Sequence, residues 1–181
     1  SWYDAAFARQ WTNGPLLLNR ETGKVVSEAD LTPDGAPDRY LVWDELRDQA
    51  LLYDSSNGVY ERDGVQPALF GARSLKGREG REILCQPVFE RLGEIASAYA
   101  PERSESITWV PANKVWQTAL LLAHNRPVSL YMWNGLGQHT NATRTSRAIA
   151  SLYALLGDFD RRGGNVIFPK GPINDVGGKE F

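Results

Sequence analysis

The protein is 181 residues long, which is the length of one domain, or of one large domain with an appendage. Hydrophobic residues make up 42% of the chain, aromatic residues 10% and charged residues 23%, and these globular values exclude wholesale disorder and low-complexity classes. Twenty Lys and Arg residues against 22 Asp and Glu residues give a net charge of −2, which argues against a general binder of nucleic acid or membrane surfaces.

Three further features of the composition bound the class of protein. The single cysteine, Cys85, can neither form an internal disulfide nor supply a cysteine metal cluster. The longest aliphatic run, Ala119 to Ala123, is far too short for a membrane span. The only methionine is Met132, so we expect the chain to be a processed product or a piece of a longer protein. Any targeting segment would then lie outside it, and no localisation is predicted.

The first half of the chain is irregular. Its first eleven residues predict an amphipathic helix whose Trp2, Phe7 and Trp11 need a covering surface. Short strands, spaced as small antiparallel strands would be, are then expected at 24–26, 40–43 and 58–60. The basic, glycine-rich stretch 71–82 is typical of a solvated loop. Residues 1–82 are therefore expected to form an irregular α+β segment with short strands.

The second half, residues 83–181, alternates helical and strand-like patterns. Helices are expected at 87–100, 111–124 and 141–156. Strands are expected at 128–133, which reads as buried, and at 165–168, with a further turn at 104–109. Thr140 or Asn141 can cap the last helix, and Gly157 is placed to end it. This alternation predicts a doubly wound, Rossmann-like α/β sheet.

A loop at 134–141 follows the predicted buried strand, where ligands bind in open α/β sheets. Gly135 and Gly137 let the backbone approach a ligand closely, and the free amides at the start of the next helix favour an anionic group. The surrounding side chains crowd donors and acceptors together, which suits a nucleotide or a pterin; they are Asn134, Gln138, His139, Thr140 and Asn141. The alternative is a plain strand-to-helix turn, because Thr140 stands where a complete G-x-G-x-x-G motif has its third glycine.

His139 is interpreted as a hydrogen-bonding group rather than a metal ligand, since no second His, Cys or carboxylate lies at ligand spacing. A later glycine-rich stretch, 163–174, contains Lys170 and Gly171. Its backbone amides and the Lys170 ammonium can be placed against an anion. The alternative for this stretch is a surface loop with a solvated lysine.

Several runs of residues, taken together, resemble the molybdopterin oxidoreductase family, the dimethyl-sulfoxide-reductase superfamily of molybdenum or tungsten enzymes. In the second half the runs that carry the resemblance are 131–141, 147–150 and 155–165. In the first half they are 10–17, 38–45 and 99–102. The resemblance runs through nearly the whole chain in one order, which is more specific than any single motif.

The resemblance implies an interior fragment of a large catalytic subunit that carries bis(molybdopterin guanine dinucleotide) with Mo or W. It assigns residues 1–82 to a neighbouring domain of that subunit, whereas residues 83–181 form a cofactor-binding segment. By the same analogy, the pterin–guanine contacts come from Asn134, Gly135, Gly137, Gln138, His139 and Thr140. Lys170 is implied as an active-site cation near the metal. Gly171 is implied as a backbone contact, because Pro172 follows it where many relatives have Gln.

The resemblance also implies what lies elsewhere in the parent subunit. The iron–sulfur cysteines and the metal ligand precede this region, so the fragment alone is expected to be inactive. Its apolar surface is expected to be covered by the remainder of the parent chain. The implied partners are a small-molecule substrate and an electron-transfer subunit.

Three alternatives to a redox enzyme remain at this point. In the first, the parent protein is a metal-free structural or electron-relay subunit of a respiratory complex. In the second, it is a non-redox, hydratase-like member of the family whose metal acts as a Lewis acid. The third alternative sets the resemblance aside and takes the chain as an autonomous nucleotide-binding domain. Nothing in the sequence predicts the substrate.

Overall fold

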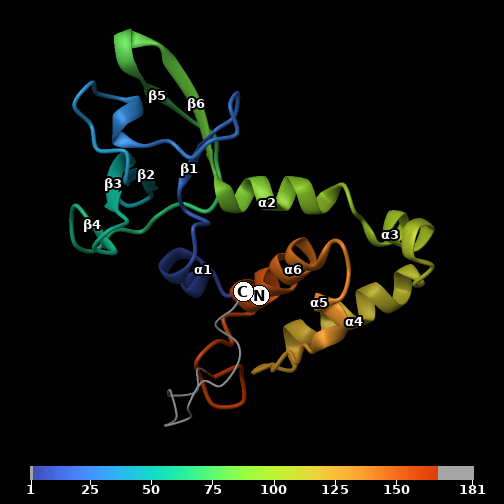
Figure 1. The fold of residues 1–181 in the computed structure, drawn as a ribbon. Coiled ribbons are helices and arrows are strands. Elements are labelled where there is room, and N and C mark those ends of the chain that lie inside the picture. Colours follow the sequence, from blue (N-terminus) through green and yellow to red (C-terminus); the bar gives the residue numbers. More distant parts are fainter. Residues whose placement is uncertain (1, 167–181) are drawn as a thin grey trace.

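The computed structural model describes residues 2–166. Their first half begins with helix α1 and contains six short strands, which form two three-stranded antiparallel sheets (Figure 1). The elements are α1 (Ala5–Trp11), β1 (Leu17–Asn19), β2 (Arg39–Asp44), β3 (Gln49–Asp54), β4 (Val59–Tyr60), β5 (Arg73–Lys76) and β6 (Glu82–Pro87), with short 3₁₀ turns at Glu28–Asp30 and Arg78–Gly80. One sheet has the order β2-β3-β4 and the other has the order β1-β6-β5.

The core of the first half lies between these two sheets. Its buried side chains come from both sheets and from the segment that follows β1; they are Leu17, Val26, Leu41, Leu75 and Cys85. Half-buried Trp43 and Ile83 pack against this cluster. The predicted strands at 40–43 and 58–60 are confirmed as β2 and β4. The prediction at 24–26 is wrong, because Val25 forms only an isolated bridge to Leu18.

The stretch predicted as a solvated loop is a β-hairpin instead. Residues 73–76 form β5, which pairs in antiparallel register with the following strand, so that Arg73 faces Cys85 and Lys76 faces Glu82. Leu75 turns into the core, whereas Ser74 and Lys76 are exposed and Arg73 is half-buried. Cross-strand pairing therefore overrides the loop-like composition of this stretch.

The second half consists of helices that extend from β6 as an arm, fold back and return to α1 (Figure 1). They are α2 (Val88–Ser97), α3 (Pro101–Thr108), α4 (Ala112–His124), α5 (Asn134–Gly137) and α6 (Ala142–Leu156). The helices predicted from 87, 111 and 141 are confirmed. Gly157 ends α6 in the left-handed conformation at φ +65°, as expected of a C-terminal glycine. None of the helices in residues 2–166 is long and apolar enough to cross a bilayer.

Three predictions for this half need correction. The stretch 104–109, expected as a turn, belongs largely to helix α3, and residues 134–137 form the short helix α5. The stretch 128–133, expected as a buried strand, is extended but pairs with no strand of the described chain. Tyr131 and Trp133 within it are 93% and 85% exposed. Residues 2–166 are thus a mixed α/β structure with small antiparallel sheets, and they do not contain a doubly wound parallel sheet.

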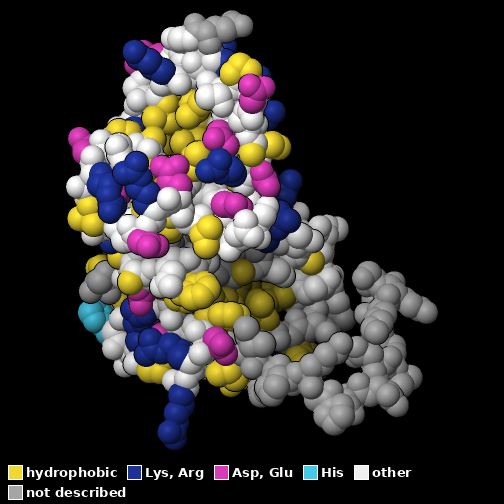
Figure 2. Space-filling view, turned by 90° about the vertical axis from the view of Figure 1, so that its left-hand side faces the viewer, with side chains coloured by type: hydrophobic (Ala, Val, Ile, Leu, Met, Phe, Trp, Pro, Cys, Tyr) yellow, Lys and Arg dark blue, Asp and Glu magenta, His cyan; other side chains and the backbone are white. Residues whose placement is uncertain are grey.

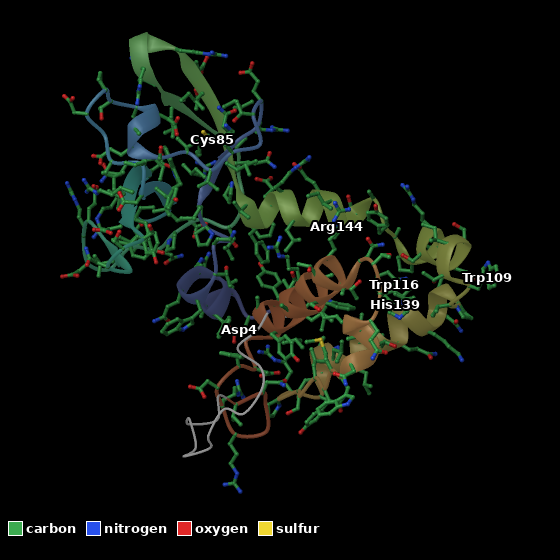
Figure 3. The ribbon with its side chains drawn as sticks, viewed as in Figure 1. Asp4, Cys85, Trp109, Trp116, His139 and Arg144 are labelled. Atoms are coloured by element: carbon green, nitrogen blue, oxygen red, sulfur yellow. The ribbon has the colours of Figure 1, made fainter. Side chains whose placement is uncertain are left out.

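Most of the helical arm has no core of its own. Helices α2, α3 and α4 contain no buried residue. Large apolar side chains about half exposed or more include Ile95, Tyr99, Trp109, Trp116 and Leu121. Figure 3 shows Trp109 at the turn between α3 and α4, on the outer side of the arm. The apolar faces that specify these helices in the sequence are therefore left open.

The accessible surface supports the same conclusion. Figure 2, which views the molecule from the side of the sheets, also shows hydrophobic patches between the charged side chains of that face. The chain exposes 13009 Å², whereas a folded monomer of 20.2 kDa exposes about 8,800 Å². Subtraction of about 2,600 Å², the largest area that residues outside 2–166 can contribute, removes only part of the difference. Residues 2–166 expose roughly 2,000 Å² more than a globular chain of their size.

Candidate functional site

The predicted ligand loop lies in the helical arm, between α4 and α6 in the chain. Residues 134–137 form the single turn α5, and His139 lies in the turn between α5 and α6 (Figure 3). The polar side chains of this loop, from Asn134 to Asn141, are all exposed. The structure therefore brings the predicted residues 134–140 together in one exposed loop before a helix.

The polar side chains of this loop are available to a ligand. Within residues 2–166, the side chains of Asn134, Gln138, His139 and Thr140 form no hydrogen bond or ion pair. An added Cβ at Gly135 or Gly137 would meet no atom within 4 Å, so the space over the backbone is open. Amide, imidazole and hydroxyl groups with open backbone beside them form a donor set that fits the polar edges of a pterin or guanine ring.

The extended segment before the loop is held by a tight turn at residues 158–165. The backbone of this turn is closed by bonds from Asn165 N to the Asp158 carbonyl (3.0 Å) and from Asp160 N to the Asn165 carbonyl (2.6 Å). Asn165 also pairs with the backbone of Leu130 through its side chain: Oδ1 accepts from Leu130 N at 2.8 Å and Nδ2 donates to Leu130 O at 2.9 Å. The hydroxyl of Tyr153 on α6 donates to the same Leu130 carbonyl at 2.7 Å.

Asp158 is the electrostatic centre of this turn. Its side chain is 1% exposed, and Oδ2 accepts a 2.9 Å bond from the backbone amide of Val128. The guanidinium groups of Arg126 and Arg161 lie 3.4 Å from its oxygens. Among the described residues Oδ1 has only the Arg161 ion pair and no hydrogen bond. Two guanidinium groups thus lie beside this buried carboxylate, and its bond to the Val128 amide fixes the start of the extended segment.

The same network connects the turn to the N-terminal helix. Arg126 also reaches the carboxylate of Asp4, at 3.4 Å, and Asp4 caps α1 by accepting from the amide of Phe7 at 2.9 Å. The amide of Asp4 donates to the carbonyl of Leu155, near the end of α6, at 2.7 Å. The first helix, the extended segment and the end of α6 therefore form one connected unit, in which α1 lies beside the C-terminal end of α6 (Figure 1).

Asp158, Asn165 and Tyr153 were not predicted as site residues. Asp158 and Asn165 lie within the run 155–165 that carries the family resemblance, but their partners are 30 and 35 residues away in the sequence. The other two predicted site residues, Lys170 and Gly171, lie outside the described residues.

Other reactive groups do not form a second centre. Residues 2–166 contain no group of three or more His, Cys, Asp or Glu residues that could hold a metal ion. Cys85 is fully buried in β6, and burial, with a smaller contribution from the carboxylate of Asp30, raises the pKa of its thiol to about 11. A thiol with that pKa is neither a nucleophile nor a ready metal ligand at neutral pH.

Comparison with known proteins identifies the class. No protein-family model matches the chain. It is 30% identical to the alpha subunit of dimethylsulfide dehydrogenase from Rhodovulum sulfidophilum, over 90% of this chain and 18% of the relative. It is 25% identical to the alpha subunit of perchlorate reductase from Dechloromonas aromatica, over 91% of this chain and 20% of the relative. It is 27% identical to a putative dimethyl sulfoxide reductase catalytic subunit of Halobacterium salinarum, over 89% of this chain and 18% of the relative.

These relatives are subunits of molybdenum oxidoreductases, and the similarity runs through nearly all of the chain. The chain therefore belongs to the dimethyl-sulfoxide-reductase family of molybdopterin oxidoreductases. It spans about a fifth of the length of the curated relatives that it matches.

Proposed function

We propose that this chain is an interior segment of the catalytic subunit of a molybdenum or tungsten oxidoreductase. The whole subunit transfers electrons, with an oxygen atom or a hydride, to or from a small substrate, and the segment alone is inactive. The observation that carries the proposal is the similarity to subunits of such enzymes over 89% to 91% of the chain. Because relatives named for substrates as different as dimethylsulfide and perchlorate share this stretch, it serves a step common to them rather than substrate choice.

That common step is the binding of the cofactor, which we take to be bis(molybdopterin guanine dinucleotide). When bound, the cofactor supplies the redox-active metal. In this chain, the side chains of Asn134, Gln138 and His139 hold the polar ring edges, with Thr140 completing the donor set. Gly135 and Gly137 allow the backbone to approach. The unpartnered state of these side chains in the described residues supports the assignment.

Lys170 and Gly171 have a separate place in the proposal. The ammonium of Lys170 is assigned as a cation near the metal, where it would stabilise negative charge on a bound substrate. Gly171 is assigned as a backbone contact to the cofactor. Both assignments rest on the position of these residues in the family resemblance.

The remainder of the subunit completes the fold around this segment. We assign residues 1–82 to a neighbouring domain and residues 83–181 to the cofactor-binding domain. The extended segment 128–133 has the composition of a buried strand and presents Tyr131 and Trp133 to solvent. In the whole subunit it becomes a strand of the doubly wound sheet. The open apolar faces of α2 and α4 are covered by the same additional chain. The iron–sulfur cluster lies outside this chain and connects the metal to an electron-transfer subunit.

The test uses the full catalytic subunit purified from a host that makes the cofactor. Metal analysis and release of guanine nucleotide by acid are expected to give two guanine nucleotides for each Mo or W. The double variant Asn134→Ala with Gln138→Ala is expected to lose most of its bound metal and most of its guanine nucleotide. The matched control is Asn57→Ala, because the Asn57 side chain bonds only within the exposed β3–β4 turn. A purified wild-type subunit without Mo or W refutes the proposal and favours the metal-free relay subunit. Full metal and nucleotide content in the double variant refutes the assignment of the loop alone.

A further inference from the structure

The turn at residues 158–165 does more than end helix α6. It lies beside the extended segment 128–130 and supplies the hydrogen bonds that a neighbouring strand would otherwise supply. Two features of the turn make this contact, the Asn165 amide and the Asp158 carboxylate. We propose that this turn is a clamp that sets the position of the loop 134–141, and that Asn165 and Asp158 are positioning residues for the cofactor. This inference rests on the function proposed above.

The first argument is the geometry at Leu130. A side-chain amide carries one acceptor and one donor in the spacing of a peptide unit, so Asn165 satisfies both backbone groups of Leu130 at once. The distances, 2.8 Å and 2.9 Å, are those of good sheet bonds. Tyr153 donates a second bond to the Leu130 carbonyl. Leu130 is thus fixed from two elements, and the candidate loop begins four residues later.

The second argument is the rigidity of the clamp itself. Asn165 and Asp158 are connected by a backbone bond of 3.0 Å across the turn. A Cβ placed on Gly164 would lie 2.2 Å from the carbonyl oxygen of Asp158, so only glycine fits at this position. Gly163 has φ +85°, and its carbonyl accepts a 2.9 Å bond from the hydroxyl of Ser129. The turn is therefore closely packed on the segment that it holds.

The third argument is the contrast with the loop. Beyond Leu130 the chain is exposed, and the side chains of Asn134, Gln138 and His139 form no bond within the described residues. The residues that support a ligand loop must be held rigidly, because a displacement of about 1 Å in the groups that contact the ligand weakens its binding. Among the described residues, the segment that leads into this loop is held by hydrogen bonds between positions 128–130 and four residues: Asp158, Gly163, Asn165 and Tyr153.

The experiment compares variants of the full catalytic subunit by hydrogen exchange and by cofactor content. In Asn165→Ala we expect the amides of residues 128–141 to exchange at least tenfold faster, and the retained metal and guanine nucleotide to fall about tenfold, the lower end of the effect of supporting residues on bound metals. Tyr153→Phe should have a smaller effect, because the Leu130 carbonyl still accepts from Asn165. Asn57→Ala removes a 2.9 Å hydrogen bond from the side-chain amide of Asn57 to Asp54, in the β3–β4 turn of the first half. It should change neither the exchange rates nor the cofactor content.

A second control separates positioning from general loss of stability. Leu51→Ala removes a side chain that is 2% exposed in β3, and we expect it to lower thermal stability at least as much as Asn165→Ala while retaining the cofactor. Equal loss of cofactor in Leu51→Ala and Asn165→Ala overturns the inference. Unchanged exchange at residues 128–141 in Asn165→Ala also overturns it. A wild-type subunit without Mo or W refutes the proposed function instead, and the exchange measurement, which needs no cofactor, then decides separately whether the clamp positions the loop.

Discussion

Asp44 at the end of β2 provides the most exacting test of the structure of the first half. Its side chain is fully buried, and Oδ1 accepts from the backbone amides of Leu46 (3.2 Å) and Gln66 (3.0 Å). Oδ2 accepts from the guanidinium of Arg47 at 2.6 Å. The carboxylate thereby connects β2 to the segment before Pro67, which is 22 residues further along the chain.

Replacement of Asp44 by Ala leaves two backbone amides without their acceptor. A hydrogen bond to a charged group contributes about 1.5–3 kcal/mol, and the bonds from these two amides, which are part-buried, both go to one fully buried carboxylate. The Arg47 side chain is 37% exposed, so water compensates part of the loss of its bond. We expect the free energy of local opening at residues 44–68 to fall by about 3–5 kcal/mol.

Asp44→Asn separates the charge from the backbone bonds. Its amide oxygen can still accept from Leu46 and Gln66, while its NH₂ group faces Arg47 without attraction. Burial raises the pKa of Asp44, but the bonds from Arg47, Gln66 and Leu46 outweigh it and leave the pKa below the ordinary value. A carboxyl group whose pKa is lower in the folded state stabilises fully above its unfolded pKa, and this stabilisation is lost as the pH falls through the folded pKa. Wild-type protection of the Gln66 amide should therefore decrease below about pH 4, and Asp44→Asn should lack this decrease.

The assay is hydrogen exchange at Leu46 and Gln66, with the β1–β6 pairs at Leu17–Asn19 as an internal reference. A loss of 3 kcal/mol corresponds to exchange faster by roughly 150-fold when opening and closing are fast compared with chemical exchange, so that the rate follows the opening equilibrium. Acceleration below about fivefold in Asp44→Ala would refute the burial argument, because exchange would then be independent of this carboxylate.

Three further predictions concern other parts of the chain. Cys85, with a pKa of about 11 and no exposed surface, should resist iodoacetamide at pH 8 until urea is added, and stoichiometric labelling of the native chain would contradict this. Gly157→Ala should destabilise the α1–α6 contact by about 1–3 kcal/mol, since φ is +65° and the new Cβ would lie 2.9 Å from those of Asp4 and Phe7. Its matched control, Gly93→Ala in open space on α2, should be neutral or stabilising by up to about 1 kcal/mol in thermal unfolding. The 181-residue chain expressed alone should self-associate at micromolar concentration through its open helical faces, and a single monomer boundary in sedimentation velocity would argue against this.

The helices were the most predictable part of the fold because their signals are local. Pro87 and Pro111 directly precede α2 and α4, and Gly157 ends α6. Apolar residues at helical spacing mark one face of each of these three helices, whereas α3 and α5 were not predicted. These signals identify a face that needs burial, but they carry no information on what buries it, and in residues 2–166 that covering surface is largely absent.

The strands were less predictable because pairing over long separations defines them. β1, β3, β5 and β6 were not predicted as strands. The pairing of β6 with β1, for example, places Leu17 opposite Pro87, 70 residues apart in the sequence. Strand β5 has basic residues at both ends and a single buried residue, Leu75, so its composition resembles that of a loop.

For the candidate site, the sequence indicates the loop but not its support. The polar side chains and glycines at 134–140 are adjacent in the chain, so their composition alone identifies them. Asn165 and Asp158 form hydrogen bonds with the backbone of Leu130 and Val128. Because every residue has a backbone, such a bond requires no particular side chain at the partner position, and no sequence pattern reveals it.

The segment 128–133 connects these observations. Its composition predicts a buried strand, and the structure shows it extended, held by side chains of the 158–165 turn, with Tyr131 and Trp133 in solvent. A strand whose neighbours belong to another part of a larger protein has these properties. On the function proposed above, the absence of a parallel sheet and the open helical faces of residues 2–166 have one cause, because both await partners from the remainder of the subunit. The hydrogen bonds from the turn at 158–165 hold residues 128–130 extended without a paired strand, and on the same proposal they position the loop without help from the remainder of the subunit.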